Sequence, residues 1–391
     1  MRHGRLHPSS VLGMTADDTA LLYSPLHSVH EAAGAKFAPF SGWLMPLEYE
    51  GVNAEHVAVR TAVGLFDVSH LGTLLVRGPG AAAALNELFT NDLSRIAAGQ
   101  AQYTMLCDES GRVIDDIIVY VLAGAANGGE AAADEVLIVP NAANAGYVRE
   151  AVEEVVGPRC EVTDAHQDMA IIAVQGPASA DLLRDAGLQT ELGYMQVERA
   201  QLDGVDVIIC RTGYTGEKGY ELLVGAADAV VLWNHLTTAG AVYGVQPCGL
   251  GARDTLRTEM GYPLHGQDLG GEIGPVEARL GWSVGWDKPD FRGRAALYAR
   301  RASDLVPKLQ GLVLLDRGVP RSGMSVHLMP DGPQVGTVTS GTFSPTLRTG
   351  VALALLDPSL RPGAEVSVNS RGRWLTARLT KLPLVESHVK D

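Results

Sequence analysis

The chain has 391 residues, more than a single hydrophobic core usually supports, so two or three domains are expected. Its composition, 46% hydrophobic and 19% charged, is typical of a soluble enzyme, and no apolar run approaches the ~20 residues of a membrane span. The formal net charge of -14 argues against nucleic-acid binding, because phosphate neutralisation requires clustered Lys and Arg. We therefore expect no nucleic acid and no membrane among the partners.

The N-terminal residues 1–20 show no hydrophobic periodicity, so we expect a disordered extension, and translation could begin at Met1 or Met14. The first residues lack the apolar stretch of a secretory signal, which favours a cytoplasmic location. The four cysteines lack metal or redox spacing and are expected to be reduced and mostly buried. No histidine pair has the spacing of a helical zinc site, so no metal is expected.

Capping, periodicity and turn residues predict the elements that follow along the chain. Residues 53–64 begin with a capping Asn and end with a Gly, which predicts a helix. Residues 66–77 end as a strand, and an Ala-rich helix is expected over 81–88. Residues 124–134 are expected to form an exposed connection to a strand at 135–139. Beyond about residue 305, short apolar runs between Gly and Pro predict a separate β-barrel or sandwich over 305–391.

Residues 101–107 and 112–120 have the composition of two strands, joined by a turn in which Gly111 supplies the left-handed conformation. If Asp108 opposes Arg112, one face of this hairpin carries Tyr103, Met105, Asp115 and Ile117. Asp116 then points to the other face. A carboxylate in such surroundings either has a raised pKa or is held ionised by hydrogen bonds, and either state suits proton handling. The alternative is that both acids are ordinary strand-edge residues.

Residues 211–221 read Arg-Thr-Gly-Tyr-Thr-Gly-Glu-Lys-Gly-Tyr-Glu and directly follow an apolar strand at 207–210. Glycine lacks a Cβ, so Gly213, Gly216 and Gly219 favour a loop whose backbone closely approaches a flat ligand. The alternative is a glycine-rich turn that binds nothing.

Several stretches together resemble one family. They are residues 40–46 (Phe-Ser-Gly-Trp-Leu-Met-Pro), 66–70 (Phe-Asp-Val-Ser-His), 111–116, 211–221, 249–257 and 340–347. In this order they resemble the T-protein of the glycine cleavage system, over roughly residues 24–385. The resemblance implies an α+β fold in which two interleaved antiparallel α+β lobes and a C-terminal β-barrel surround a central folate cavity. Residues 21–290 would form the folate-binding core, with 71–160 as one lobe and the flanking segments as the other.

The resemblance also implies a reaction. The methylene group of an aminomethyl-dihydrolipoyl arm on the lipoylated H-protein would pass to tetrahydrofolate, a co-substrate, with release of ammonia and without a metal. One alternative is a folate-dependent demethylase of a small sulfonium or methylamine substrate. Another is the non-enzymatic folate-binding protein that assists iron-sulfur enzymes, but its Lys-Gly-Cys-Tyr-x-Gly-Gln-Glu segment is absent here.

The resemblance further assigns residues. Asp115 matches the catalytic aspartate, and the hairpin register selects it over Asp116 as well. The expected folate-binding residues are Glu221, which would grip the pterin ring, Tyr214, Arg253, Tyr103, Asn141 and Tyr262. Arg253 and Arg257 could instead be structural ion-pairing residues. His70 is expected to be a packed or capping histidine. Many relatives have Leu-Tyr-Gly where this chain has Leu264-His-Gly266, so His265 adds a titrating group near the pocket.

Overall fold

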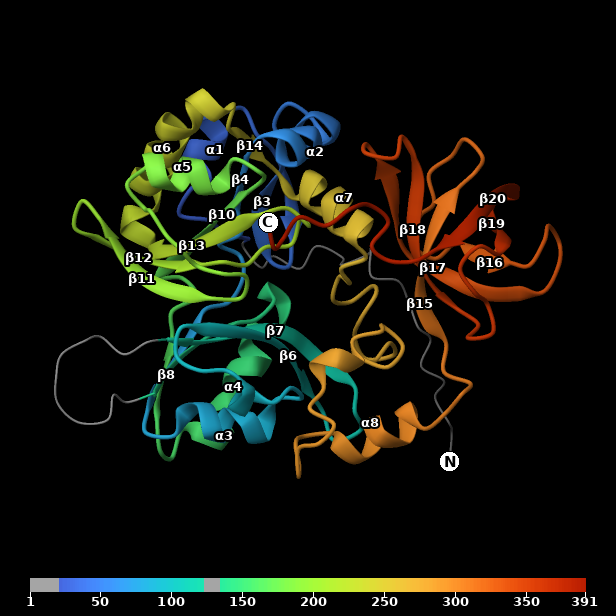
Figure 1. Ribbon diagram of the computed structural model, residues 1–391, viewed down its shortest axis with the longest axis horizontal. Coiled ribbons are helices and arrows are strands. Elements are labelled where there is room, and N and C mark those ends of the chain that lie inside the picture. Colours follow the sequence, from blue (N-terminus) through green and yellow to red (C-terminus); the bar gives the residue numbers. More distant parts are fainter. Residues whose placement is uncertain (1–20, 123–133) are drawn as a thin grey trace.

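A computed structural model describes residues 21–122 and 134–391, which form two α+β lobes beside a β-barrel (Figure 1). The predicted fold class is confirmed. The expectations for residues 1–20 and for nearly all of the 124–134 connection lie outside the described residues.

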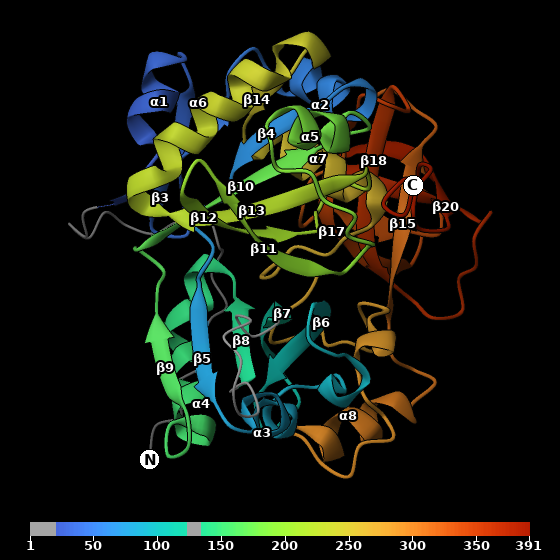
Figure 2. The same ribbon diagram turned by 60° about the vertical axis from the view of Figure 1, so that its left-hand side comes forward.

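A six-stranded sheet forms the first lobe. One of its strands, β4, comes from about 100 residues earlier in the chain than the other five. In spatial order its strands are β11 (Val197–Leu202), β12 (Val205–Cys210), β13 (Gly219–Gly225), β10 (Met169–Gln175), β4 (Gly64–Asp67) and β14 (Gln246–Cys248). Neighbours are antiparallel except β14 and β4, which are parallel. One face packs on α1 (His27–Ala32), α5 (Ser179–Asp185) and α6 (Ala229–Gly240), as Figure 2 shows. The other face looks toward the second lobe.

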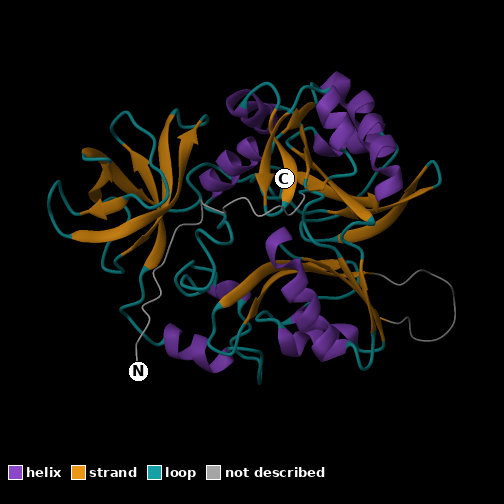
Figure 3. Cartoon of the chain, turned by 180° about the vertical axis from the view of Figure 1, so that it is seen from behind, coloured by secondary structure: helices purple, strands orange, loops and turns teal. Residues whose placement is uncertain are grey.

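An antiparallel five-stranded sheet forms the second lobe (Figure 3). Its strands are, in spatial order, β6 (Gln100–Cys107), β7 (Val113–Leu122), β8 (Asp134–Val139), β5 (Leu74–Gly78) and β9 (Glu161–Asp164). Its apolar face is covered by α3 (Ala81–Leu88) and α4 (Ala145–Val156). These strands lie between β4 and β10 in the chain, so the two lobes interleave. The predicted hairpin strands, the strand at 135–139 and the helix at 81–88 are confirmed.

The predicted helix near residues 53–64 is α2 (Val52–Thr61), but its capping residue differs from the prediction. Asn53 lies inside the helix, and the buried carboxylate of Glu55 accepts from the backbone N–H of Gly51 at 3.2 Å. The same carboxylate accepts from the N–H of Gly249 at 2.8 Å, at the start of α7 (Leu250–Met260). A small sheet of β1 (Leu22–Tyr23), β3 (Trp43–Glu48) and β2 (Lys36–Phe40) packs on α7 through β3.

The C-terminal residues form a closed six-stranded barrel, which confirms the β-barrel prediction. Its strands, in order around the barrel, are β15 (Lys308–Leu314), β18 (Thr349–Leu356), β17 (Gln334–Ser344), β16 (Ser325–His327), β19 (Glu365–Ser370) and β20 (Arg373–Thr380). The connection to the barrel contains η5 (Gly281–Ser283) and α8 (Arg294–Arg301). The remaining short 3-10 turns are η1 (Leu93–Arg95), η2 (Ala142–Asn144), η3 (Ala226–Asp228) and η4 (Ala241–Tyr243).

After the barrel, the chain returns to the first lobe and lies along the glycine-rich loop that precedes β13. The N–H of His388 donates to the carbonyl of Gly216 at 2.8 Å, and the His388 ring lies 3.0 Å from the carboxylate of Glu217. Arg211 donates to the carbonyl of Asp391 at 3.1 Å. The segment 384–391 therefore closes this loop from outside.

The register of the β6–β7 hairpin differs from the prediction by one residue. The turn pairs as expected, since the N–H of Asp108 donates to the carbonyl of Arg112 at 2.9 Å. A bulge then lies beside Cys107: Val113 opposes Cys107, but Asp115 opposes Leu106, which leaves Ile114 as the extra residue. Met105 consequently faces Asp116, and the prediction that Asp115 shares the face of Tyr103 is wrong.

All four cysteines are free and three of them are buried, as predicted. Within the described ranges, no helix combines the length and the apolar character needed to cross a bilayer.

Candidate active site

A cavity of about 240 Å³ lies between the two lobes. Side chains from both sheets, from the loop before β13 and from the residues after α7 line it. All six residues predicted to bind folate are among them: Tyr103, Asn141, Tyr214, Glu221, Arg253 and Tyr262. Asp115, the predicted catalytic residue, is fully buried and does not line the cavity, whereas Asp116 does.

Glu221 reaches the cavity because β13 alternates its side chains between two faces. Leu222 and Val224 point to the helices of the first lobe, so Glu221 points toward the second. One of its oxygens accepts from the hydroxyl of Thr212 at 2.6 Å. Among the described residues, no group donates to its other oxygen. Glu221 is only 8% exposed, so it is a buried carboxylate with acceptor capacity left for a ligand.

Tyr214 and Tyr262 stack with their ring centroids 5.7 Å apart, and the Tyr214 hydroxyl donates to the carbonyl of Pro263 at 2.5 Å. The Arg253 guanidinium lies 4.7 Å from the centroid of the Tyr214 ring. Burial lowers the pKa of Arg253, and the nearby charge of Glu221 opposes that shift. Two flat rings, a cation and a carboxylate thus meet on one wall.

Arg253 and Arg257 lie one turn apart on α7 but have different roles. Arg257 is 2% exposed and forms ion pairs with Asp254 at 2.7 Å and Asp268 at 2.6 Å. The alternative that Arg257 is a structural ion-pairing residue is therefore correct. Within residues 21–122 and 134–391, Arg253 has no ion-pair partner within 4.0 Å. Its charge is therefore available to a bound anion or dipole.

The opposite wall carries Asp116. Its carboxylate accepts from the Tyr103 hydroxyl at 2.9 Å and from the side-chain amide of Asn141 at 3.1 Å. The Tyr103 ring stacks on Trp282, with centroids 5.5 Å apart. Burial raises the pKa of Asp116, and the neighbouring His265 opposes the shift.

Asp115 lies on the other face of β7, near the N-terminus of α4. Its carboxylate accepts from the backbone N–H of Asn141 at 2.9 Å and from the side-chain amides of Asn141 and Asn144 at 2.9 and 2.7 Å. Burial, followed by the charge of Asp116, raises the pKa of Asp115 to about 8, and the amide donors oppose that shift. Two neighbouring carboxyl groups with raised pKa values readily hold and release a proton near neutral pH.

Oxygen or nitrogen atoms of Asp115, Asp116 and His265 lie within 4.8 Å of one another, which is the spacing of a possible metal-ligand set. However, amide hydrogens of Asn144 already point at Asp115 and His265. The geometry suits hydrogen bonding and proton transfer.

His70 lines the cavity but is only 2% exposed. Burial and the charge of Arg253 lower the pKa of His70 to about 3, so its ring is neutral at physiological pH. The Phe40 ring packs edge-on against it at 5.3 Å. These contacts agree with the packed-histidine interpretation.

The glycines of residues 211–221 serve mainly internal packing. A Cβ at Gly213 or Gly219 would collide with the buried side chain of Gln175, and one at Gly216 would collide with Met260. Gly213 lines the cavity, but Gly216 and Gly219 do not. The expectation that all three approach a ligand is wrong, although the loop does place Thr212 and Tyr214 at the cavity.

Trp282 has no recognisable signal in the sequence; its side chain is 67% exposed and stacks on Tyr103 at the cavity wall. The sequence places Asp116 beside Asp115, but the predicted hairpin register puts its side chain on the face opposite Tyr103. The bulge that corrects the register has no local signature in the residues around Cys107.

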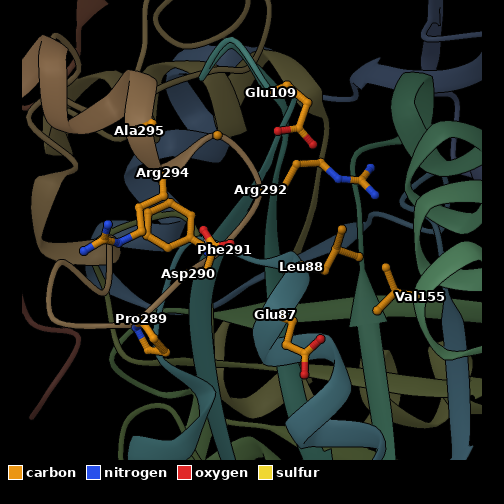
Figure 4. A pocket seen from close by; sticks show the side chains of 11 residues that line it. Glu87, Leu88, Glu109, Val155, Pro289, Asp290, Phe291, Arg292, Arg294 and Ala295 are labelled. Carbon is orange, nitrogen blue, oxygen red and sulfur yellow. Dashed lines mark hydrogen bonds between the residues drawn. The ribbon is translucent and has the colours of Figure 1, made fainter.

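A larger hollow of about 580 Å³ lies at the far end of the second lobe (Figure 4). Its side chains come from α3, from α4, from the β6–β7 turn and from residues 289–295. Among its charged residues, Arg292 pairs with the exposed Glu154 at 3.0 Å. In contrast to the inter-lobe cavity, this hollow is an open groove with solvated charges.

Comparison with known proteins identifies the family. The GCVT N-terminal domain model matches residues 26–288, and the glycine cleavage T-protein C-terminal barrel model matches residues 308–386. The chain belongs to the glycine cleavage T-protein family.

Family members with closely similar sequences include an aminomethyltransferase of Parafrankia sp. (strain EAN1pec), 54% identical over 93% of this chain and 98% of the relative. An aminomethyltransferase of Mycobacterium tuberculosis is 50% identical over 95% of this chain and 98% of the relative. The crystal structure of glycine cleavage system aminomethyltransferase T from Bartonella henselae superposes with a TM-score of 0.86, at 34% identity, covering 95% of this chain and all of the other. The chain is thus an aminomethyltransferase, and its inter-lobe cavity is the candidate active site.

Proposed function

We propose that this aminomethyltransferase transfers the methylene group of an aminomethyl-dihydrolipoyl arm, carried by the H-protein, to tetrahydrofolate. The observation that carries the proposal is the single cavity in which Glu221, Arg253 and two stacked tyrosines face Asp116 and Tyr103. One wall suits a flat, polar bicyclic ring and the other suits proton transfer.

The pterin ring of tetrahydrofolate is proposed to lie against Tyr214, with its 2-amino and ring N–H groups donating to Glu221. A carboxylate that accepts two parallel hydrogen bonds is a strong partner for such a guanidine-like edge. Arg253 supplies a half-buried cation for ring oxygen or for the carboxylates of the folate tail.

In the proposed reaction, the methylene carbon exchanges its bonds to sulfur and to the amine nitrogen for bonds to two folate nitrogens. Each folate nitrogen loses one proton. One proton goes to the amine, which leaves as ammonia, and the other goes to sulfur, which restores the dihydrolipoyl thiol. Two proton transfers require a group that accepts and returns protons near neutral pH.

We assign that role to Asp116. The sequence predicts Asp115 as the catalytic residue, but only Asp116 lines the cavity. Asp115 is proposed to act behind it as the second member of the pair, since its charge and that of Asp116 influence each other. Tyr103 and Asn141 orient the Asp116 carboxylate through the hydrogen bonds described above.

The test compares turnover with two kinds of donor: the aminomethylated H-protein and a free small-molecule methyl donor. Purified enzyme is supplied with tetrahydrofolate and aminomethylated, lipoylated H-protein, and ammonia and methylenetetrahydrofolate are measured. We expect both products in equal amounts. Absence of turnover, together with methyl transfer from a free sulfonium or methylamine compound, would favour the demethylase alternative.

A further inference from the structure

A histidine outside the proposed reaction steps contacts the acid pair through a single amide group. Asn144 lies at the N-terminus of α4, and its Nδ2 atom is 2.7 Å from Oδ1 of Asp115 and 3.1 Å from Nδ1 of His265. An amide nitrogen carries two hydrogens and accepts none. Both contacts therefore use hydrogens of Asn144, and Nδ1 of His265 must present its lone pair.

The hydrogen-bond pattern fixes the tautomer of His265. With Nδ1 as an acceptor, the neutral ring carries its hydrogen on Nε2. A hydrogen on Nδ1 would face a hydrogen of Asn144. The reversed amide would place its oxygen against Oδ1 of Asp115, which can only accept whenever this carboxyl group is ionised. Asp115 and His265 consequently both hold the Asn144 amide with its nitrogen turned toward them.

We propose that His265 is a positioning residue for the acid pair: its Nδ1 lone pair holds the Asn144 amide with the nitrogen turned toward Asp115. The effect on turnover rests on the function proposed above, whereas the hydrogen-bond geometry does not depend on what fills the cavity.

Loss of the acceptor on His265 would change how the pair binds protons. Asn144 provides one of the three donors that stabilise ionised Asp115. A freely rotating amide would offer its oxygen part of the time, which favours protonated Asp115. The titratable groups that face the pair are Tyr103 from β6, His265 from the residues after α7 and Tyr214 from the loop before β13. Asp115 and Asp116 titrate together, so the apparent pKa values of both steps would rise.

The matched test compares His265→Leu with His265→Asn. The two side chains have nearly the same size, but only Asn offers an oxygen close to the position of Nδ1. We expect the acid limb of the rate profile to move up by about 0.5–1 pH unit in the Leu variant, the equivalent of one hydrogen bond. The Asn variant should stay near the wild-type profile, and the affinity for tetrahydrofolate should be unchanged in both.

A second readout does not require turnover. Nitrogen NMR of the wild-type protein should show the His265 ring with its hydrogen on Nε2, and the pH dependence of unfolding should shift in the Leu variant and not in the Asn variant. A ring protonated on Nδ1, or identical pH profiles for Leu, Asn and wild type, would overturn the proposal. If the wild-type protein transfers no aminomethyl group, the proposed function fails, while the NMR experiment still decides the role of His265.

Discussion

The two walls of the inter-lobe cavity carry opposite arrangements of charge. On the wall from the five-stranded sheet, Asp116 lines the cavity and Asp115 lies behind it; burial raises the pKa values of both, and the charge of Asp116 raises that of Asp115 further. On the wall from the six-stranded sheet, the carboxylate of Glu221 faces the cation of Arg253. Like charges in a low-dielectric site store a proton, whereas unlike charges create a fixed dipole that recognises polar groups.

In the proposed mechanism, this difference separates proton handling from ligand recognition within one cavity. It also shows why size alone does not mark the site. The groove of Figure 4 is larger, yet its Arg292 is paired at the surface. The inter-lobe cavity instead contains the half-buried guanidinium of Arg253 and the carboxyl groups of Glu221 and Asp116, which protein contacts leave with capacity for a ligand.

The largest effect is expected from Asp116→Asn, which keeps the shape but removes the proton-accepting group. The rate of aminomethyl transfer should fall on the order of 10²- to 10⁴-fold. Calorimetry should show tetrahydrofolate binding close to wild type. Asp287→Asn, at a 95% exposed side chain, serves as the control and should leave the rate unchanged. A variant with normal turnover would remove Asp116 from the mechanism.

On the other wall, Glu221→Gln exchanges a carboxylate for an amide that can accept only through one oxygen. Tetrahydrofolate affinity should weaken by about 1.5–3 kcal/mol, because a charged hydrogen-bonding partner is lost. Titration calorimetry measures this directly, and Glu154→Gln at a 71% exposed side chain is the matched control. Equal affinities for the Glu221 variant and wild type would show that the pterin edge binds elsewhere.

The smallest effect concerns stability against pH. Asp115 has a pKa of about 8 in the folded protein and about 3.9 when unfolded, so between these values the folded state binds more protons. Its contribution to stability is fully present below about pH 4 and is lost as the pH rises toward 8, with a slope of at most about 1.4 kcal/mol per pH unit.

Asp115→Asn should therefore flatten the decline of the unfolding free energy between pH 5 and 8, as measured by denaturant titration. Parallel curves for variant and wild type would mean that Asp115 is ionised throughout this range, which would erase the contrast between the two walls.

Much of the fold could be predicted from the sequence, because helix composition, turn residues and strand spacing depend on neighbouring residues in the chain. The Ala-rich helix at residues 81–88 was correctly bounded, and the turn at Gly111 and the spacing of the barrel strands were correctly recognised. The cavity residues came from the family resemblance, and the structure brings six of them together.

The register of β7 could not be predicted in this way. The tip of the hairpin packs closely against Gly293, where a Cβ would meet the carbonyl of Asp108, so its geometry depends on residues almost 200 positions away. One extra residue at Ile114 then exchanges the faces of β7 on which the two acids lie. Sequence pattern identifies a pair of neighbouring carboxylates, but tertiary packing decides which one reaches the cavity.

The segment 384–391 gives the proposed pterin wall an unusual order of assembly. It holds Gly216 and Glu217 in place, yet it follows every strand of the barrel in the chain. During synthesis, the first lobe can fold around its own core long before this clasp emerges from the ribosome. The loop that carries Thr212 and Tyr214 would thus acquire its final support only after the barrel strands have been made.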